Sequence, residues 1–433
     1  MSDFVVAYVL SNELVKVSSQ LPSNKNRSLL VHSLVKELGL LSPRSSNSQC
    51  SRLQLLRPNL ASANDLSSYH ARDYLDYVLN CNHFSNDGTP FDAEKAAEYG
   101  IEEDCPWFQG LPAYIRLVGG ASLTAANTLV QGQADIAINW DGGRHHAQKS
   151  QASGFCYVAD CVLALLALKR SRLPSSLETV VSPNVSLRKP RIMYLDLDLH
   201  FSDGVSHAFY NTPETPQILT LSIHHAAPGF FPISPLSLLP PSEPSSSFDP
   251  FTLSVPLAVG ASSQTFFSVW NGCVERVKDA FQPDYVVVQC GVDGLAGDSY
   301  GIWNWSLGGH EDVTGAEEGS LGWCVEKVCH TWGCKTLLLG GGGYNSPNAA
   351  RAWAYLTSIA LSRPLPLSTH IPDHTFFPLY APSFTLDVPP NTLSDENTVM
   401  YLEDIRDRFD WVCEGIRERL TTFMTGASGN RKS

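Results

Sequence analysis

The sequence predicts an α/β fold whose central parallel sheet is buried beneath helices. Six short runs are continuously apolar, which is typical of strands covered on both faces, and they span residues 5–10, 136–140, 192–199, 218–223, 285–290 and 336–339. Helical stretches at 121–129 and 158–169 lie between such runs. This alternation of strands and helices indicates an α/β architecture.

The composition is that of a globular protein with a large core, since 43% of the 433 residues are apolar and 17% are charged. The formal net charge of -13 argues against a nucleic-acid-binding surface and favours a basic partner. The 11 cysteines form no C-x-x-C pair, so we expect reduced thiols in a cytosolic or nuclear protein. Neither a signal peptide nor a membrane span is expected, because the N-terminus lacks a basic region and the longest apolar stretch, near 162–168, is short.

Further segments are predicted from their local patterns. Residues 233–247 are rich in proline and serine and predict a mobile loop that is dispensable for folding, and a second loop is expected at 308–319. Near the C-terminus, apolar residues recur at steps of three and four and predict an amphipathic helix packed on the domain; they are Leu402, Ile405, Phe409, Val412, Ile416 and Leu420. Residues 426–433 are expected to form a flexible tail.

Polar side chains follow five of the predicted strands at the point where each strand ends. They are His145 and His146, the set Asp196, Asp198 and His200, the pair His224 and His225, Asp293, and Tyr344. In open parallel sheets, ligands bind at the carboxyl ends of the strands. We therefore expect these side chains to converge on one site, but we interpret His224 and His225 as a surface pair.

Asp196, Asp198 and His200 alternate along one predicted strand and so share a face. Two buried carboxylates side by side repel one another unless a cation or a donor neutralises them, and a metal ion is the simplest neutraliser. The alternative is an edge strand with solvated acids, but the flanking leucines oppose it. Together with Asp293, Asp198 and His200 would supply three oxygen and nitrogen ligands and leave a position for water, as catalytic zinc requires.

His145 and His146 follow two glycines that allow a sharp turn, so both imidazoles can approach one point. One would act as a general base and the other as an electrostatic helper or an acid. Asp196 and Asp203 are candidates to orient the two imidazoles through their outer nitrogens.

Two rival interpretations concern the same strand ends. Cys156 and Cys290 offer soft metal ligands, but we expect both to be small core residues. The four glycines at 340–343 lack the following Lys-Ser/Thr of a phosphate-binding loop and the spacing of a dinucleotide fingerprint. Such glycines would instead let Tyr344 approach the metal and donate to a developing oxyanion, while a core tyrosine bonded to the backbone is an open alternative.

Five motifs, in order along the chain, resemble those of the class I zinc-dependent histone deacetylases of the arginase-deacetylase superfamily. They are INWDGGRHHAQKSQASGFCY, YLDLDLHFSDGV, HHAAPGFFP, VVVQCGVDGLAGD and LLLGGGGYN. The similarity runs from about Val6 to the final helix, which implies a single catalytic domain over 1–425 with insertions near 233–247 and 308–319. It also implies a sheet of eight parallel strands, an active site at their carboxyl ends, and a narrow tunnel that reaches zinc.

The resemblance implies hydrolysis of the acetyl amide of N6-acetyl-lysine in histone tails or other proteins, with release of acetate. Matched residue by residue, the motifs imply zinc ligands at Asp198, His200 and Asp293, a catalytic pair at His145 and His146 with His146 as the base, and a carbonyl-polarising Tyr344. They imply a tunnel wall of Gly154, Phe155 and Phe231, with Asp104 holding the substrate backbone at the rim. A structural potassium (K+) site is implied at Asp196 and Ser222, together with backbone carbonyls of Asp198, His200 and Ile223.

Several positions depart from the family pattern without removing a catalytic group. Phe201 stands where a second His is usual, Arg144 replaces an apolar residue, and Ala159 replaces Asn. Tyr300 lies where a Leu or Met lines the tunnel mouth, so we expect it to contact the substrate. These departures are expected to alter substrate preference and rate.

The expected partners are acetylated lysine peptides of histones or other proteins, in the nucleus, the cytoplasm or both, whereas nucleic acid and membranes are not expected. Corepressors are an open question. Ser299 and Pro347 stand where corepressor-bound members carry Arg for an inositol phosphate, so that regulator is not expected.

Three rival functions deserve comparison. They are a deacetylase of small acetylpolyamines, a catalytically weak scaffold that binds acetylated tails or corepressors, and an arginase-like two-manganese hydrolase. A scaffold would be expected to lack Tyr344 or a zinc ligand, and neither is lost. The manganese enzyme needs further Asp ligands that the sequence does not supply near His145 and Asp198.

Overall fold

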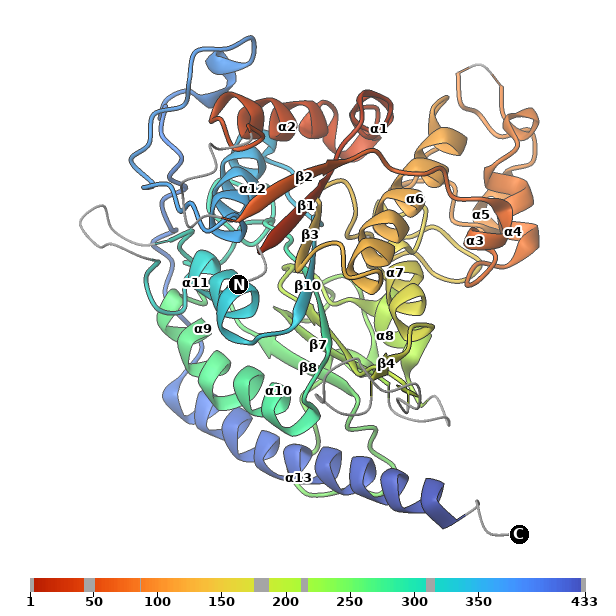
Figure 1. The fold of residues 1–433 in the computed structure, drawn as a ribbon. Helices are drawn as coiled ribbons and strands as arrows, with labels where there is room; N and C mark the ends of the chain where they lie inside the picture. The colour runs from red at the N-terminus through yellow and green to blue at the C-terminus, as the bar shows by residue number, and fades with distance from the viewer. Residues whose placement is uncertain are drawn as a thin grey trace.

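The computed structural model describes residues 4–42, 51–85, 87–174, 187–211, 217–308 and 316–429, with the side chains of the last helix described as far as Thr421. Within these ranges, eight parallel strands form one sheet in the order β2-β1-β3-β10-β9-β6-β7-β8 (Figure 1). The strands are β1 (Val5–Val9), β2 (Arg52–Leu56), β3 (Ile136–Asn139), β6 (Ile192–Asp196), β7 (Ile218–His225), β8 (Thr252–Leu257), β9 (Tyr285–Gln289) and β10 (Lys335–Leu339). The predicted α/β fold with eight parallel strands is therefore confirmed.

The six interior strands of the sheet coincide with the six apolar runs, and the apolar pattern misses only its two edge strands. In β2, the polar residues Arg52 and Gln54 lie on either side of Leu53, so this strand has no continuously apolar run. In β8, Pro256 interrupts the apolar residues, and its missing N–H is tolerated because β8 lies at an edge. A separate antiparallel pair joins β4 (Leu173–Pro174) to β5 (Leu187–Arg188).

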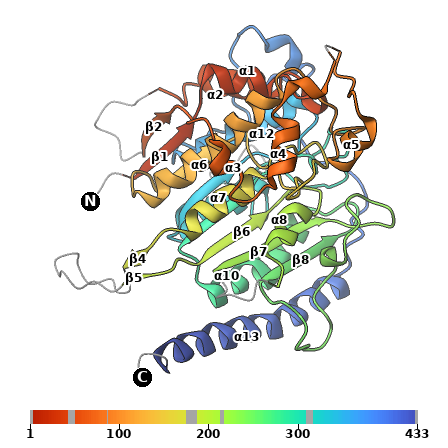
Figure 2. The same cartoon turned by 90° about the vertical axis from the view of Figure 1, so that its right-hand side faces the viewer.

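Helices cover both faces of the sheet. Val6 and Tyr8 of β1 belong to one apolar cluster, which includes residues of α2 and of α9–α13, whereas Ala7 and Val9 belong to a second cluster with residues of α1 and α3–α8. Figure 2 shows α7 and α8 in front of the strands and α10 behind them. The helices are α1 (Asn12–Ser18), α2 (Arg27–Glu37), α3 (Ala63–Leu66), α4 (Arg72–Val78), α5 (Ala93–Glu98), α6 (Leu111–Val130), α7 (Asp160–Lys169), α8 (Asp203–Phe209), α9 (Ser263–Val269), α10 (Glu275–Phe281), α11 (Leu321–Glu326), α12 (Ser346–Ala360) and α13 (Val399–Gly429).

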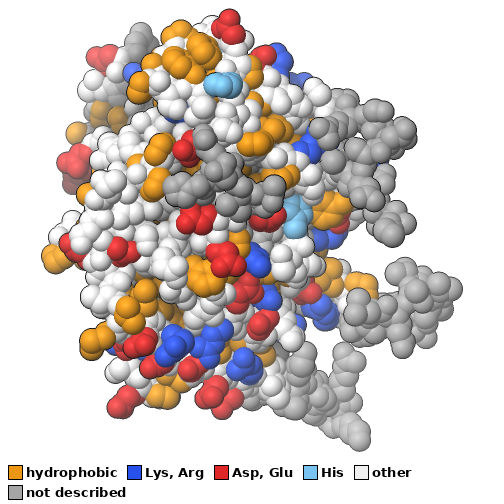
Figure 3. Space-filling view, turned by 90° about the vertical axis from the view of Figure 1, so that its left-hand side faces the viewer, with side chains coloured by type: hydrophobic (Ala, Val, Ile, Leu, Met, Phe, Trp, Pro, Cys, Tyr) orange, Lys and Arg blue, Asp and Glu red, His pale blue; other side chains and the backbone are white. Residues whose placement is uncertain are grey.

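The predicted C-terminal amphipathic helix is confirmed as α13, which runs along the outside of α10 (Figure 1). Four of the six predicted apolar positions are buried, namely Ile405, Phe409, Val412 and Ile416. Figure 3 shows acidic and basic side chains intermixed over the lower part of the face that it draws. Arg276 of α10 pairs with Asp410 of α13. Residues 430–433 lie outside the described ranges, so the flexible tail over 426–433 stays a prediction. Among the helices described, none has the length and the apolarity that crossing a membrane requires.

The proline- and serine-rich segment 233–247 is a loop with one short helical turn, η3 (Pro235–Ser237). Its first half is packed, however, because Ser254 of β8 donates to the Leu236 carbonyl (2.7 Å) and Arg408 of α13 donates to the Pro240 carbonyl (2.7 Å). Residues 241–247 are exposed. The segment is thus a loop, as predicted, and its contacts at 236 and 240 are an addition to the prediction; that it is mobile and dispensable for folding stays a prediction. Residues 309–315 of the second predicted loop lie outside the described ranges.

Candidate metal centre and active site

Four neighbouring strands, β3, β10, β9 and β6, carry predicted site residues in the loops at their carboxyl ends. These loops bring the residues together. The rings of His145 and His146 lie 4.0 Å apart, and those of His146 and His200 lie 5.9 Å apart. The Tyr300 ring lies 5.4 Å from His200 and 5.2 Å from Tyr344, so it connects the two. The predicted convergence on one edge of the sheet is therefore observed.

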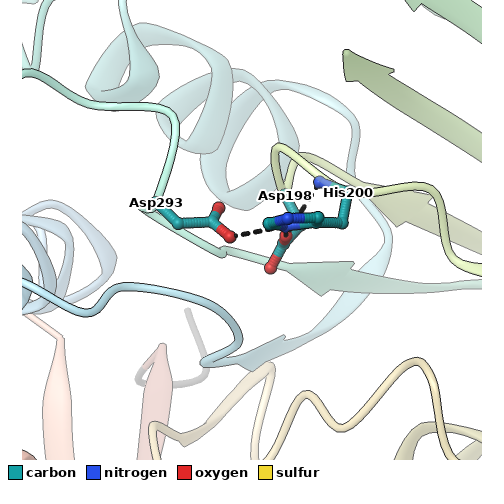
Figure 4. Close-up of side chains that lie close together, drawn as sticks. All are labelled: Asp198, His200 and Asp293. Carbon is teal, nitrogen blue, oxygen red and sulfur yellow. Dashed lines mark hydrogen bonds and ion pairs between the residues drawn. The ribbon is translucent and has the colours of Figure 1, made fainter. Parts of the chain in front are cut away.

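Asp198, His200 and Asp293 each direct one donor atom to a common point (Figure 4), and these three atoms lie within 4.8 Å of one another. His200 Nδ1 lies 2.8 Å from Asp293 Oδ2 and 3.4 Å from Asp198 Oδ1. All three side chains are buried. Within the described residues, this is the one cluster of His, Cys, Asp or Glu that has the proximity needed for a metal ion.

The backbone around the triad is shaped by its own carboxylates. The strand predicted over 192–199 ends at Asp196, because Asp196 Oδ1 accepts the Asp198 N–H (3.0 Å) and Asp198 Oδ1 accepts the His200 N–H (3.0 Å). Asp293 Oδ1 likewise accepts the Leu199 N–H (3.0 Å). Backbone donors that would otherwise extend the strand therefore fix the aspartates in place.

Two glycines let the backbone approach the aspartates closely. A Cβ atom at Gly342 would lie 2.3 Å from Asp293 Oδ2, and one at Gly291 would lie 2.0 Å from Asp198 Oδ2. The Gly342 N–H donates to Asp198 Oδ2 (2.8 Å), and Gln289 Nε2 donates to the same oxygen (2.7 Å). The glycine run thus allows close contact and a hydrogen bond with the two aspartates, and we do not interpret it as a phosphate-binding loop.

The triad favours positive charge. Burial opposes protonation of His200, but the charges of Asp293 and Asp198 outweigh it and raise the His200 pKa to about 10. Burial, followed by repulsion from Asp198, raises the pKa of Asp293. Two buried carboxylates that share one imidazole form an environment into which a divalent cation fits.

The two adjacent histidines differ in charge because their surroundings differ. His145 Nδ1 lies 2.9 Å from Asp196 Oδ2, and His146 Nδ1 lies 2.7 Å from Asp203 Oδ1. Burial opposes protonation of His145, but the charges of Asp196 and Asp198 prevail and raise its pKa to about 9. For His146, burial and then the charge of His145 lower the pKa. The pair therefore combines a protonated imidazole with a neutral one.

The backbone at Tyr344 is held from two sides. Arg27 Nη1 donates to the carbonyls of Gly341 (3.0 Å) and Gly343 (2.8 Å), and Asp298 Oδ2 accepts the Tyr344 N–H (2.6 Å). Arg27 has no part in the sequence prediction, and Asp298 enters it only as the last residue of the motif VVVQCGVDGLAGD, without a role of its own. Their contacts with the backbone around Tyr344 leave no local sequence signal, because each side chain reaches that backbone from a distant part of the chain.

The side chain of Tyr344 is half-buried, and its ring lies 5.4 Å from that of Phe155. It is thus a site residue with solvent access rather than a fully buried core tyrosine. Burial, followed by the charges of Asp293 and Asp198, holds the phenol pKa well above its ordinary value. The hydroxyl accordingly stays protonated and available as a hydrogen-bond donor.

Aromatic side chains extend from the histidines to the surface. The Phe231 ring lies 4.9 Å from His146, and the Tyr300 ring lies 5.4 Å from His200. Phe231 is 42% exposed and Tyr300 is 40% exposed, so both reach the surface, as expected of residues at the predicted tunnel mouth. The predicted tunnel residues therefore lie beside the predicted catalytic residues.

Gly154 and Asp104, which are predicted for the tunnel wall and its rim, lie close to His146 and to each other. A Cβ atom at Gly154 would lie 2.4 Å from His146 Cδ2, so only glycine lets the chain pass this close to the imidazole. The exposed Asp104 accepts the Gly154 N–H at Oδ2 (2.9 Å). The predicted rim carboxylate is thus bound to the predicted tunnel wall.

His224 and His225 are buried, so the interpretation of a surface pair is wrong. β7 continues two residues beyond the predicted run and carries both into the core. His224 bonds the Ser222 hydroxyl (3.0 Å) and the Ser237 carbonyl (3.1 Å), and burial lowers its pKa to about 3. Ser222 pairs in register with Asp196 across β7 and β6, so these two predicted potassium ligands lie side by side.

The departures from the family pattern are accommodated by local contacts. The Arg144 side chain is buried and donates to the Asp141 carbonyl (3.1 Å). The Ala159 N–H donates to His70 Nε2 (3.0 Å), and the Phe201 ring lies 4.9 Å from His224. Each departing residue therefore has a defined contact within the folded chain.

Comparison with known proteins agrees with this geometry. The model of the histone deacetylase domain matches residues 21–360. Histone deacetylase 8 of Xenopus tropicalis is 35% identical over 403 residues, which cover 92% of this chain and 95% of that protein. Histone deacetylase 6 of Arabidopsis thaliana is 35% identical over 82% of this chain and 67% of its own length. Human histone deacetylase 1 is 32% identical over 89% of this chain and 70% of its own length. The chain therefore belongs to the histone deacetylase family.

Proposed function

We propose that the protein hydrolyses the acetyl amide of N6-acetyl-lysine in histone tails or other proteins and releases acetate. The observation that carries this proposal is the arrangement of three kinds of group around one point. A buried triad suited to a cation, a neutral imidazole and a protonated phenol lie together at the carboxyl edge of the sheet. Metal-assisted amide hydrolysis uses a Lewis acid, a base and an oxyanion donor, and these groups would supply all three.

Asp198, His200 and Asp293 would hold zinc. Their two oxygens and one nitrogen form the mixed set of three protein ligands that is typical of catalytic zinc. When bound, zinc would lower the pKa of water toward ~7 and polarise the substrate carbonyl. Gln289 and Gly342 donate to Asp198 Oδ2, so they orient this ligand.

His146 would act as the general base and His145 as the electrostatic partner. The Nδ1 atom of His146 faces Asp203, so its proton belongs on that nitrogen and Nε2 is free to accept a proton from water. His145 faces Asp196, which favours its protonated form, and positive charge on His145 lowers the pKa of its neighbour. After attack, protonated His146 would return its proton to the leaving lysine amine.

Tyr344 would donate its hydroxyl proton in a hydrogen bond to the carbonyl oxygen as negative charge grows there. Phe155 and Phe231 would form the tunnel wall around the aliphatic part of the lysine side chain. The absence of a side chain at Gly154 leaves room for the His146 imidazole. Asp104 would hold the substrate backbone at the rim.

The substrates and partners follow from the same features. Acetylated peptides of basic proteins suit a chain with a formal net charge of -13. We also propose a structural potassium ion at Asp196 and Ser222 with the carbonyls of Asp198, His200 and Ile223. An inositol phosphate is not proposed as a regulator, because Ser299 and Pro347 replace the arginines that would bind it. Corepressor partners and a location in the nucleus, the cytoplasm or both accord with the family.

The experiment is turnover of a panel of acylated lysine peptides and acetylpolyamines by purified protein, with and without a zinc chelator. We expect turnover of acetyl-lysine peptides that the chelator abolishes and that added zinc restores. Asp198→Ala should contain no zinc and should be inactive. Preferential turnover of acetylpolyamines would replace the proposed substrate class, and an active, zinc-free Asp198→Ala would contradict the assigned metal site.

A further inference from the structure

We propose that Asp298 is the positioning residue that sets both Tyr344 and Tyr300, and so couples the mouth of the site to the carbonyl-polarising phenol. The inference rests on the proposed deacetylation. Asp298 lies in the loop after β9, Tyr300 lies in the same loop, and Tyr344 lies in the loop after β10. Because β9 and β10 are neighbours, one side chain can bridge the two loops.

The bridge is made by both oxygens of one carboxylate. Asp298 Oδ2 accepts the N–H groups of Tyr344 (2.6 Å) and Asn345 (2.8 Å), and Oδ1 accepts the N–H of Tyr300 (3.1 Å). Hydrogen bonds from backbone N–H groups to a charged acceptor are among the stronger ones in proteins. Asp298 therefore fixes the main chain of both tyrosines at once.

Tyr344 needs such an anchor because it follows a glycine run. Gly341 and Gly343 have φ angles of 152° and 131°, which side-chain-bearing residues rarely adopt. Arg27 restrains the carbonyls of these two glycines, but it does not reach the Tyr344 amide. Asp298 restrains the Tyr344 amide, and it thereby fixes the backbone position from which the phenol side chain extends.

Tyr300 is the second tyrosine on the same anchor. Its ring packs edge-on against Tyr344 (5.2 Å, 71° between planes) and against His200 (5.4 Å, 80°). A displacement of the Tyr300 backbone would therefore move a ring that contacts both the oxyanion donor and a metal-site residue. Because the two rings are in contact, we expect a displacement of Tyr300 to displace the Tyr344 phenol as well.

Asp298→Asn tests the role with almost no change in size. An amide has one acceptor oxygen, so its NH2 group must face either the Tyr344 and Asn345 donors or the Tyr300 donor. We expect kcat to fall about a hundredfold with a smaller change in KM, because misplacement by about 1 Å costs that much. The matched control is Asp249→Asn. Asp249 is also a buried carboxylate that accepts backbone N–H groups, but it precedes β8 at the opposite edge of the sheet.

A double-mutant cycle separates positioning from general damage. If Asp298 acts through the Tyr344 hydroxyl, Asp298→Asn should lower kcat far less in the Tyr344→Phe background than in the wild type. An equal fall in both backgrounds would overturn the proposal. If Asp298→Asn does not fold, Asp298→Glu takes its place, because it keeps both acceptor oxygens and moves them.

A second readout does not depend on activity. In crystal structures of the zinc-loaded wild type and the Asp298→Asn variant, Tyr344 and Tyr300 should be displaced while Asp198, His200 and Asp293 keep their positions. Unmoved tyrosines would overturn this inference even if the wild type is an active deacetylase. Absence of turnover by the wild type would instead overturn the proposed function, and the displacement would still decide whether Asp298 is the anchor.

Discussion

The Tyr344 phenol and the His146 imidazole have the opposite proton requirements that amide hydrolysis imposes on a donor and a base. Burial and the nearby carboxylates raise the phenol pKa, whereas burial and the charge of His145 lower the pKa of His146. At neutral pH the phenol therefore keeps its proton, and the unprotonated imidazole can accept one. The two residues lie in different loops, His146 after β3 and Tyr344 after β10.

Tyr344→Phe keeps the ring and removes only the hydroxyl. If the phenol donates mainly to charge that exists in the transition state, turnover should fall while peptide binding stays similar. One such donor contributes about 2.7–4 kcal/mol, so kcat should fall roughly a hundred- to a thousand-fold. The measurement is kcat and peptide affinity at equal zinc content. Tyr401→Phe is the control, because its hydroxyl donates to the Pro256 carbonyl of the edge strand β8 and not to a predicted site residue, so its loss should leave kcat unchanged. Wild-type turnover by Tyr344→Phe would refute the mechanism.

Tyr300→Leu removes an aromatic ring from the mouth of the site. The ring contacts His200 and Tyr344 and is 40% exposed, so its loss should widen the entrance while all three proposed zinc ligands are kept. We expect the relative rates on acetyl-lysine and longer acyl-lysine peptides to change while zinc content stays the same. Tyr210→Leu removes a similarly exposed ring at the far end of α8 and should leave the ratio unchanged. An unaltered profile for Tyr300→Leu would exclude this residue from substrate selection.

Individual site residues were predictable from sequence to the extent that they follow strands. Asp198 and His200 have the alternating pattern of a strand end, and the pattern locates them correctly even though β6 stops at Asp196. Asp298 lacks such a pattern, because two of its three backbone partners, Tyr344 and Asn345, lie 46 and 47 positions away and only the adjacent loops reveal them. Gln289 did leave a signal, as a polar residue inside an apolar strand.

At the scale of elements, the start of α7 shows how the helix that follows the catalytic loop is held. Ala159 at this N-cap offers no side-chain acceptor, and its own N–H donates to His70 Nε2 (3.0 Å). His70 Nδ1 faces the Lys149 carbonyl (3.2 Å), so the imidazole must be neutral with its proton on Nδ1. Burial is the main cause that lowers the His70 pKa to about 4.

His70 therefore predicts a pH-dependent stability. The unfolded histidine has a pKa of about 6.5, so between about pH 6.5 and pH 4 the unfolded state binds more protons than the folded state. Stability must fall as the pH drops through this window, by about 2 kcal/mol between pH 7 and pH 5. Urea denaturation of the wild type and of His70→Gln should show a steeper loss in the wild type. If the stability of the two proteins fell equally with pH, the pKa of His70 would not be lowered in the folded protein.

The loop at 233–247 predicts two different responses to deletion. Residues 241–247 are exposed, so removing 242–246 should change the melting temperature by only a few degrees, since shortening a surface loop costs little. Removing 235–239 should cost much more, because the Leu236 and Ser237 carbonyls accept from Ser254 and His224. Thermal melts of the two deletions test this, and similar losses would show that the packed half adds no stability.

For the whole molecule, the sheet order explains why the fold was more predictable than the site. Six interior strands are buried on both faces and are continuously apolar, whereas edge strands such as β8 tolerate Pro256 and escape the pattern. The order β3-β10-β9-β6 then places four carboxyl ends in a row, and the site follows from that row. His224 and His225 were mispredicted because a pattern cannot tell where β7 ends.

The same architecture predicts how the protein responds to loss of metal. Two apolar clusters, one on each face of the sheet, hold the strands without help from Asp198, His200 or Asp293. The raised pKa of His200 also lets the imidazole carry a positive charge between the two carboxylates. A chelator should therefore abolish turnover while the far-ultraviolet circular dichroism spectrum stays that of the folded protein.

Added zinc should stabilise the folded state by mass action, by about 2.7 kcal/mol when free zinc exceeds its dissociation constant a hundredfold. The melting temperature should accordingly rise with zinc concentration in the wild type and stay constant in Asp198→Ala, which lacks a ligand. Potassium should be held constant in both, because the proposed potassium site shares Asp198. If chelation instead melted the helices, the triad would be a folding element of this chain, since the two apolar clusters would then be insufficient to hold the sheet.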